Sequence, residues 1–300
     1  MANIQALQSR FGIDGCVRFE QETNGLPQIV VDSEQAEARI YLHGAHVAHY
    51  QPANQAPLLF MSRCSEMQHG APIRGGVPIC FPWFGQKTGD ADAPMHGLAR
   101  LVEWEVESVR LVSNRDIEAT LRYQPQANMQ NYWPHPFELR HKVTVGSSLT
   151  MALETRNVGH GPFTYEQALH TYLAVGDVAT IQICGLEGTA YLDKVTPPEN
   201  KRQGPKPIDI AMETDRVYLE TSTACMVKDP SLKRNIVIEK EGSNNTVVWN
   251  PWADKAKAMP DFGDDEYKHM VCVETCAVGK NAVTLAAGGS YEMAARIGCA

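Results

Sequence analysis

Alternation of apolar and polar side chains is the feature that most constrains how this chain can fold. Between residues 137 and 145, the odd positions are apolar apart from His141, and polar or charged side chains lie between them. The same period of two recurs over residues 149–153. This period is typical of a strand with one face against a core and the other toward water, which antiparallel sheets allow.

Similar strand patterns occur along most of the chain. We expect further strands over residues 16–20, 28–32, 39–50 (with a glycine break), 104–112, 116–123, 235–240, 246–249 and 291–297. Glycine, proline and asparagine separate them, and the one short helix expected lies at residues 7–11. The pattern therefore predicts an all-β fold, a large antiparallel β-sandwich with few short helices, and disfavours a doubly wound α/β fold.

No repeat or linker divides the chain, so we expect residues 1–300 to form a single domain. The Pro- and Lys-rich residues 196–207 are interpreted as a surface loop. The segment 71–85 contains prolines and glycines among aromatic residues, which excludes a helix or an ordinary central strand. We expect an ordered loop there, and loops of this kind often carry functional residues.

Charge and composition narrow the classes of partner. The formal net charge of −8 argues against nonspecific binding to nucleic acid or to an anionic membrane. No apolar run is long enough for a transmembrane helix, and residues 1–12 lack the apolar region of a secretory signal. The eight cysteines are scattered, which favours reduced thiols and a cytoplasmic location.

Metal binding is not expected from the sequence. Cys272 and Cys276 have no second Cys or His pair at zinc-finger spacing. His43, His46 and His49 are three residues apart on an expected strand, so neighbours in this set face opposite sides. We interpret them as ordinary surface or turn histidines.

Two polar residues stand out because they lie in apolar surroundings. His170 follows Ala168-Leu169, and Glu274 ends the run Val271-Cys272-Val273. An unpaired buried polar group costs roughly 1–3 kcal/mol, so each should have a partner or a function. One interpretation is a core histidine that is hydrogen-bonded to a neighbour. The other is an acid–base pair that opens a sugar hemiacetal, in which one group takes the C1 hydroxyl proton and the other protonates the ring oxygen.

A series of short motifs favours the second interpretation. In chain order they are Arg-Gly-Gly-Val-Pro (74–78), Pro-Trp-Phe-Gly (82–85), His-Gly-Leu-Ala-Arg (96–100), Ala-Leu-His-Thr-Tyr (168–172), Tyr-Leu-Asp-Lys-Val (191–195), Thr-Asp-Arg-Val-Tyr (214–218), Val-Trp-Asn-Pro-Trp (248–252) and Val-Cys-Val-Glu (271–274). Together they resemble the hexose-6-phosphate mutarotase branch of the aldose 1-epimerase family, over about residues 28–297.

The resemblance implies a galactose-mutarotase-like β-sandwich with a sugar site in a cleft across the larger sheet. It also implies that His170 is the general acid and Glu274 the general base. His96 and Asp215 would bind sugar hydroxyls, and Arg74 would bind the substrate and possibly its phosphate. Alternative roles are a turn cap for His96 and a hydrogen bond to its own backbone for Asp215.

Recognition of the substrate's phosphate group is a more specific expectation than recognition of the sugar. Arg74 and Arg100 both have the planar fork that holds phosphate oxygens in pairs, so their convergence would make a local anion site. The alternative for Arg100 is a surface ion pair, and Lys87 is a weaker phosphate candidate. We interpret Lys194 and Asp193 as an ordinary exposed pair, and expect Trp83 or Phe84 near the cleft.

The expected function is therefore interconversion of the α and β anomers of a hexose 6-phosphate. Its partner would be a small sugar phosphate, and no metal or redox cofactor is required. We expect a monomer, since nothing in the sequence demands an oligomer. The alternative is a sugar-phosphate binding or sensor protein of the same fold that does not catalyse. A glycosidase or lyase would need a second acidic residue in the cleft, for which Asp215 is the obvious candidate.

Overall fold

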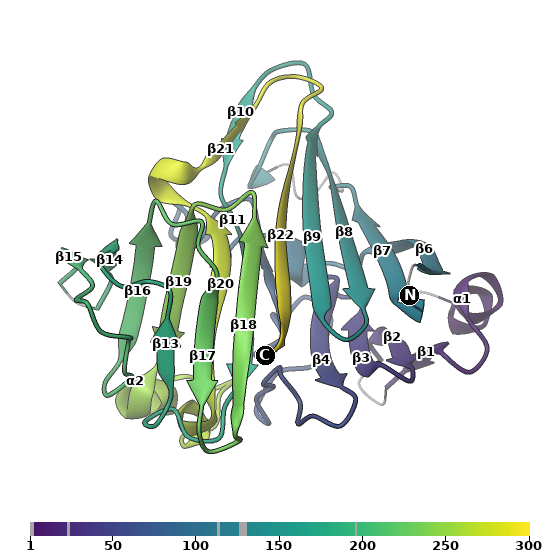
Figure 1. Cartoon of the computed structure of the whole chain (residues 1–300). Coiled ribbons are helices and arrows are strands. Elements are labelled where there is room, and N and C mark those ends of the chain that lie inside the picture. The colour runs from purple at the N-terminus through teal and green to yellow at the C-terminus, as the bar shows by residue number, and fades with distance from the viewer. Residues whose placement is uncertain (1–2, 23–24, 113–114, 126–130, 196) are drawn as a thin grey trace.

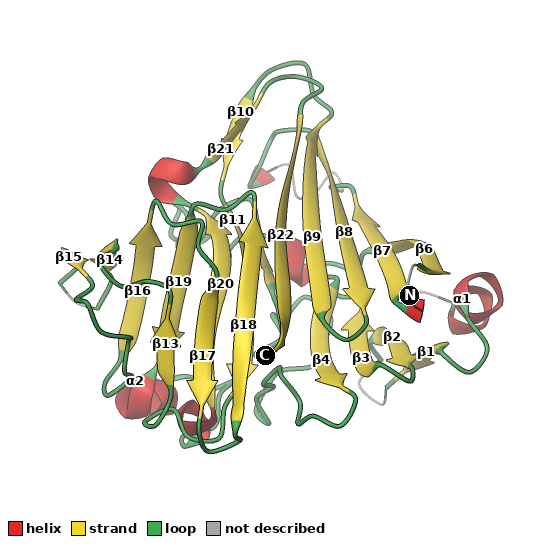
Figure 2. Ribbon diagram, in the orientation of Figure 1, coloured by secondary structure: helices red, strands yellow, loops and turns green. Residues whose placement is uncertain are grey.

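Two eight-stranded sheets that face each other form the body of the molecule in the computed structural model (Figure 1). The structure describes all residues except 1–2, 23–24, 113–114, 126–130 and 196. Strands and connecting loops account for nearly all of the described chain, and its helices are few and short (Figure 2). No helix in this described part has the length and apolar character needed to cross a membrane.

The first sheet, in the foreground of Figure 1, is antiparallel at every pairing. Its strands lie in the order β13 (Gln182–Cys184), β17 (Cys225–Asp229), β18 (Arg234–Glu241), β22 (Ser290–Cys299), β9 (Leu149–Asn157), β8 (Phe137–Val145), β7 (Ile117–Tyr123) and β6 (Glu105–Leu111). It contains the strands with the clearest alternation in the sequence.

The second sheet lies behind the first and carries the motifs identified above. Its order is β15 (Glu199–Arg202), β14 (Ala190–Asp193), β16 (Thr214–Leu219), β19 (Asn245–Asn250), β20 (Met270–Ala277), β11 (Gln167–Leu169) and β5 (Ile79–Cys80), with β12 (Tyr172–Ala174) also paired to β20. β20 is the central element, because β19, β11 and β12 all pair with it.

Smaller elements close the edges. A four-stranded sheet contains β1 (Val17–Gln21), β2 (Pro27–Asp32), β3 (Ala36–Tyr41) and β4 (His46–Pro52), and the two-stranded piece at the top of Figure 1 contains β10 (Phe163–Tyr165) and β21 (Val283–Leu285). The helices are α1 (Ile4–Phe11), α2 (Trp252–Ala258) and the 3₁₀ turns η1 (Ala99–Leu101), η4 (Glu266–His269) and η5 (Gly279–Asn281).

The middle of the second sheet is buried on both faces, which explains why its central strand, β20, does not alternate in polarity. Successive side chains of a strand point to opposite faces. Val271 and Val273 of β20 join the large core that the two sheets share. Cys272 and Cys276 point the other way, into a second apolar cluster that also contains Trp249. Glu274 therefore lies on this second face.

The predicted all-β class and β-sandwich are confirmed, and every strand range named from the sequence coincides with an observed strand. The expected irregular segment 71–85 is confirmed, apart from the two-residue edge strand β5. Two details were wrong. Residues 196–207, interpreted as a surface loop, include the exposed edge strand β15. His43 and His46 are buried rather than at the surface, and the Nε2 atom of His46 lies close to the backbone of Gly76.

Candidate active site

A cavity of about 330 Å³ opens on the second face of the second sheet. Its wall contains five of the six site residues predicted from the sequence: Arg74, His96, His170, Asp215 and Glu274. These residues come from five separate stretches of the chain, so the fold alone brings them together. The volume lies in the range of sites that bind small molecules.

His170 and Glu274 form the deepest polar pair of the wall. His170 lies between β11 and β12, at a break between two short strands that both pair with β20. Its backbone N–H donates to the Pro78 carbonyl, while Thr171 O accepts from Val273 N. This geometry places the imidazole beside the β20 side chain of Glu274, with Nε2 3.3 Å from Oε1.

Both groups retain unused polar atoms. His170 is 7% exposed and Glu274 is 1% exposed. Within the described residues, neither His170 Nδ1 nor Glu274 Oε2 has a hydrogen-bond partner. Buried polar atoms without partners are rare in native proteins and call for an explanation, such as a catalytic role. A core histidine with all its hydrogen bonds satisfied does not fit this geometry.

Burial dominates the electrostatics of this pair. Burial, followed by the positive charges of Arg100 and Arg74, lowers the pKa of His170 to about 3. Burial and the nearby carboxylate of Asp215 raise the pKa of Glu274 well above its ordinary value, although Lys194 opposes this. Both shifts favour neutral groups. A protonated His170 is therefore a strong acid and an ionised Glu274 a strong base.

Aromatic rings fix the orientation of the imidazole. The ring of Tyr172 stacks on that of His170, with centroids 4.8 Å apart and planes 14° apart. The rings of His96 and Trp249 approach His170 edge-on, at centroid distances of 5.5 and 6.1 Å. These contacts restrict the rotation of the His170 side chain.

His96 is held by the irregular loop that the sequence marked as unusual. Its backbone has a positive φ of 63°, and the next residue, Gly97, lies so close to Phe81 that a Cβ atom would meet the Phe81 carbonyl oxygen at 2.0 Å. The backbone N–H of Gly85 donates to His96 Nδ1 at 3.1 Å. In the neutral ring Nε2 then carries the proton, which leaves a donor for a sugar hydroxyl.

Arg74 bridges two loops at the wall. Its Nε and one terminal nitrogen contact Asp261 Oδ2 at 3.0 and 2.9 Å, and its other terminal nitrogen donates to the Tyr172 hydroxyl at 3.0 Å. Although burial opposes it, the proximity of Tyr172 and Asp261 raises the pKa of Arg74. Arg74 is therefore charged and fixed in position, but several of its donors are already in use.

Arg100 is not among the residues that line the cavity, in contrast to the expectation that it would converge there with Arg74. It belongs to η1, where a terminal nitrogen donates to the Met95 carbonyl at 2.6 Å. Burial lowers the pKa of Arg100, and its Nε has no partner among the described residues. The guanidinium therefore lies outside the cavity wall, of which Met95 and His96 are part, and it affects the site only through its charge.

Asp215 lies on β16, directly opposite Trp249 of β19, and both line the cavity. Burial raises the pKa of Asp215, while Lys194 and Lys255 oppose the shift. The carboxyl group is close enough to Glu274 to affect its charge, so the two acidic groups occupy one region of the wall.

Lys194 is the functional candidate that the sequence interpretation missed. Its neighbour Asp193 pairs with Lys201 at 3.0 Å, whereas Lys194 lines the cavity with its ammonium 5.3 Å from the ring centre of Phe84. Lys194 makes no ion pair with any described residue, unlike Lys255, which binds Glu213. The Tyr-Leu-Asp-Lys-Val motif contained the signal for this site.

The remaining expectations have mixed outcomes. Phe84 lines the cavity as expected, while Trp83 packs in a separate cluster and donates to the Pro94 carbonyl. Trp249 belongs to the second apolar cluster and also contributes to the wall. Lys87 is outside the lining, because its ammonium binds Asp90 and the carbonyl of Tyr132.

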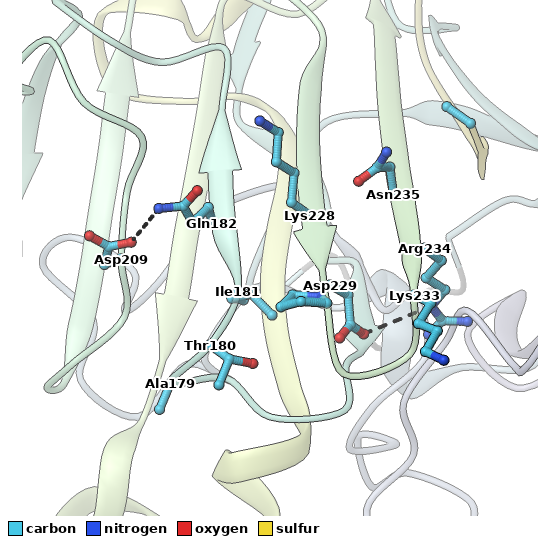
Figure 3. A pocket seen from close by; sticks show the side chains of 12 residues that line it. Ala179, Thr180, Ile181, Gln182, Asp209, Lys228, Asp229, Lys233, Arg234 and Asn235 are labelled. Carbon is cyan, nitrogen blue, oxygen red and sulfur yellow. Dashed lines mark hydrogen bonds and ion pairs between the residues drawn. The ribbon is translucent and has the colours of Figure 1, made fainter.

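A second cavity, of about 430 Å³, lies between β13, β17 and β18 near the C-terminus (Figure 3). Its two most buried charged side chains are used in structural contacts. Asp229 accepts hydrogen bonds from the backbone of Gly176 and Leu232, and Arg234 donates to the carbonyls of residues 56, 57 and 174. None of the predicted site residues lines it, so the smaller cavity is the candidate active site.

Comparison with known proteins identifies the family of the chain. The model of the aldose 1-epimerase family matches residues 27–298. A relative from Cenchrus ciliaris is 38% identical over 278 residues, which cover 90% of this chain and 83% of the relative. A relative from Escherichia coli is 35% identical over 259 residues, 86% of each chain. Both carry the provisional name glucose-6-phosphate 1-epimerase.

Solved structures share the whole architecture. The crystal structure of a provisionally named mutarotase, YeaD from Salmonella typhimurium, superposes with a TM-score of 0.89 at 31% identity and 99% coverage of both chains. A galactose mutarotase-like protein from Clostridium acetobutylicum has a TM-score of 0.72 at 14% identity, with 95% of this chain and 98% of that chain covered. The galactose-mutarotase-like fold is thereby confirmed.

Proposed function

Since the chain belongs to the aldose 1-epimerase family, we propose that it interconverts the α and β anomers of a hexose 6-phosphate, with glucose 6-phosphate as the expected substrate. The observation that carries the proposal is the buried pair of His170 and Glu274, 3.3 Å apart in the cavity wall. The reaction needs one base and one acid that act on the same hemiacetal.

The proton transfers balance as follows. Glu274 takes the proton of the C1 hydroxyl, and His170 gives a proton to the ring oxygen as the C1–O5 bond breaks. The bonding electron pair goes to O5, and C1 becomes an aldehyde. After rotation about the C1–C2 bond, the C5 hydroxyl attacks the other face of C1. His170 takes its proton back, Glu274 returns its own, and no electrons are exchanged with a cofactor.

The burial of His170 and Glu274 supports these steps. In the reactive form, His170 carries a proton and Glu274 does not, and the first step turns both into neutral groups. Burial shifts both pKa values in the direction that favours the neutral products. Each group is expected to contribute roughly 10²–10⁴ to the rate.

We assign the hydroxyl contacts to His96 and Asp215. The protonated Nε2 of a neutral His96 can donate to a hydroxyl oxygen, and burial helps to keep this ring neutral because it lowers the pKa. The carboxylate of Asp215 can accept from a hydroxyl on the opposite side. These assignments leave Glu274 and His170 free to act on C1 and O5.

The phosphate subsite follows from the distribution of positive charge. Lys194 is unpaired among the described residues and faces the cavity, while Arg74 lines the same cavity with part of its fork engaged by Asp261. We assign the phosphate to Lys194 and Arg74, with Arg100 contributing its field from behind the wall. Burial, followed by the positive charges of Arg100, Arg74 and Lys194, lowers the pKa of His170, so a bound phosphate would offset the part of this shift that the charges cause.

The test is NMR exchange spectroscopy on glucose 6-phosphate at anomeric equilibrium. We expect exchange cross-peaks between the anomers to grow when the protein is added. Acceleration with free glucose but not with the phosphate ester would remove the phosphate assignment. Thermal stabilisation by glucose 6-phosphate without faster exchange would instead identify a binding or sensor protein. The monomeric state and the cytoplasmic location remain predictions.

A further inference from the structure

A third side chain lies beside the candidate acid–base pair. Cys272 and Glu274 are two residues apart on β20 and point to the same face. One ligand atom each of His170, Cys272 and Glu274 lies within 4.8 Å of the other two. Within the described residues, this is the only group of three or more His, Cys, Asp or Glu side chains close enough to share a metal ion.

The donor set is that of zinc rather than of magnesium or calcium. An imidazole nitrogen, a thiolate and a carboxylate oxygen are the usual ligands of a zinc site with three protein ligands and one open position. Tetrahedral bonds of about 2.0–2.3 Å place neighbouring ligand atoms about 3.3–3.6 Å apart. The 3.3 Å between His170 Nε2 and Glu274 Oε1 already matches this spacing. Cys272 Sγ lies within 4.8 Å of both other ligand atoms, so only a small approach would complete the set.

The carboxylate of Glu274 and the access from the cavity also favour a metal here. Glu274 Oε2 is buried and has no partner among the described residues. A divalent cation with one carboxylate and one thiolate is neutral overall, which removes the cost of burying Glu274 as an isolated anion. His170 and Glu274 line the open cavity, so an ion can enter from that side and keep its fourth position toward solvent.

Neighbouring positive charges limit which ions can bind. Arg74, Arg100 and Lys194 all influence the charge of His170, and they repel any cation. A hard ion held by oxygen alone would have only Glu274 to offset this repulsion. A thiophilic ion gains the bond to Cys272, so the site selects zinc and similar metals.

We propose that His170, Cys272 and Glu274 bind Zn²⁺ and that the ion inhibits the enzyme. The metal would occupy the nitrogen and the oxygen that transfer protons in the proposed reaction, and the Cys272 thiol would release its proton to solvent on binding. Metal binding itself stands on the ligand geometry. Inhibition in addition rests on the proposed function.

The experiment uses Co²⁺ as a spectroscopic probe and Zn²⁺ as the inhibitor, added to the metal-free full chain. In the wild type we expect one equivalent of Co²⁺ to give the charge-transfer absorption of a thiolate–cobalt bond. Cys272→Ser should lose this absorption, whereas the matched control Cys276→Ser should keep it. Cys276 is equally buried on the same face of β20 but is not in the group.

Anomer exchange provides the second measurement. Zn²⁺ should abolish exchange in the wild type and in Cys276→Ser, and a chelator should restore it. Cys272→Ser should retain basal exchange and need at least roughly tenfold more Zn²⁺ for the same inhibition, in line with the 10–100-fold effects of perturbing metal sites. Cys272→Ala serves as a second variant if the buried serine hydroxyl prevents folding.

The outcomes separate the two proposals. A cobalt–thiolate absorption that Cys272→Ser removes supports the metal site even if the wild type does not catalyse anomer exchange, in which case only the proposed function fails. Absence of that absorption, or its persistence in Cys272→Ser, overturns the metal site and leaves the function intact. Equal sensitivity of wild type and Cys272→Ser to Zn²⁺ would place the inhibitory ion elsewhere and overturn the proposal.

Discussion

Replacing Glu274 with glutamine separates the chemistry of this carboxyl group from its shape. Glutamine has nearly the same volume and can still contact His170 Nε2, from which Oε1 lies 3.3 Å away. It cannot accept a proton from the C1 hydroxyl. Loss of a general base typically costs roughly 10²–10⁴ in rate, which corresponds to a barrier higher by about 3–5 kcal/mol.

The same substitution should not destabilise the fold. Glu274 is almost fully buried, one of its oxygens lacks a partner, and the carboxylate of Asp215 is close enough to repel it. A neutral amide removes this repulsion and the cost of burying a charge. We therefore expect an equal or higher melting temperature at pH 7 together with the loss of activity.

The assay is exchange spectroscopy on glucose 6-phosphate, with thermal unfolding measured on the same samples. A matched control is Glu239→Gln, which changes an exposed carboxylate of β18 in the first sheet, where it pairs with Arg296 of the neighbouring strand β22. The control should keep the wild-type exchange rate. If Glu274→Gln also keeps most of that rate, Glu274 is not the base. If it melts well below the wild type, the energetic reasoning about its burial is wrong.

Three further predictions concern other side chains. His170→Ala should lower the exchange rate by roughly 10²–10⁴, and added imidazole should restore part of it; full activity without imidazole would exclude His170 as the acid. Lys194→Gln should raise the KM for glucose 6-phosphate but not for free glucose, while Lys87→Gln, which lies outside the cavity lining, should change neither; equal effects in both variants would contradict the phosphate assignment. Burial lowers the pKa of His141 from 6.5 in the unfolded chain to about 4, so the unfolded state binds more protons between these values and stability falls as the pH drops from 6.5 to 4. This loss of stability amounts to about 3 kcal/mol, at 1.36 kcal/mol per pKa unit. It should be absent from His141→Gln when free energies of unfolding are measured across that pH range.

Local sequence was sufficient to predict six of the eight strands of the first sheet, all except β13 and β17. The strands β8 and β9 have one face against the core and pair along nine residues, so their alternation is easy to recognise. The short strands of the second sheet have no such signal. β5, β11 and β12 contain two or three residues each, and their position depends on pairing with distant segments.

Five of the six predicted residues line one cavity, but Arg100 does not and Lys194 was missed. Arg74, Arg100 and Lys194 all lie in the motifs, yet a motif does not show on which side of the wall a side chain lies. The Met95 carbonyl holds Arg100 behind the wall, whereas the engagement of Asp193 by Lys201 leaves Lys194 facing the cavity. These outcomes depend on contacts between segments, which no local pattern contains.

The strand that carries the proposed base, β20, lacks the polar–apolar alternation from which other strands were predicted. Every residue of β20 is buried, because one face packs in the main core and the other forms the floor of the site. A strand buried on both sides should be apolar throughout, and an ionisable side chain there opposes folding. Its presence, with one oxygen left without a described partner, is explained if that oxygen is kept for a substrate proton. The apparent defect in the core and the proposed base are then the same atom, and the opposite expected effects of Glu274→Gln on stability and on activity follow directly from this.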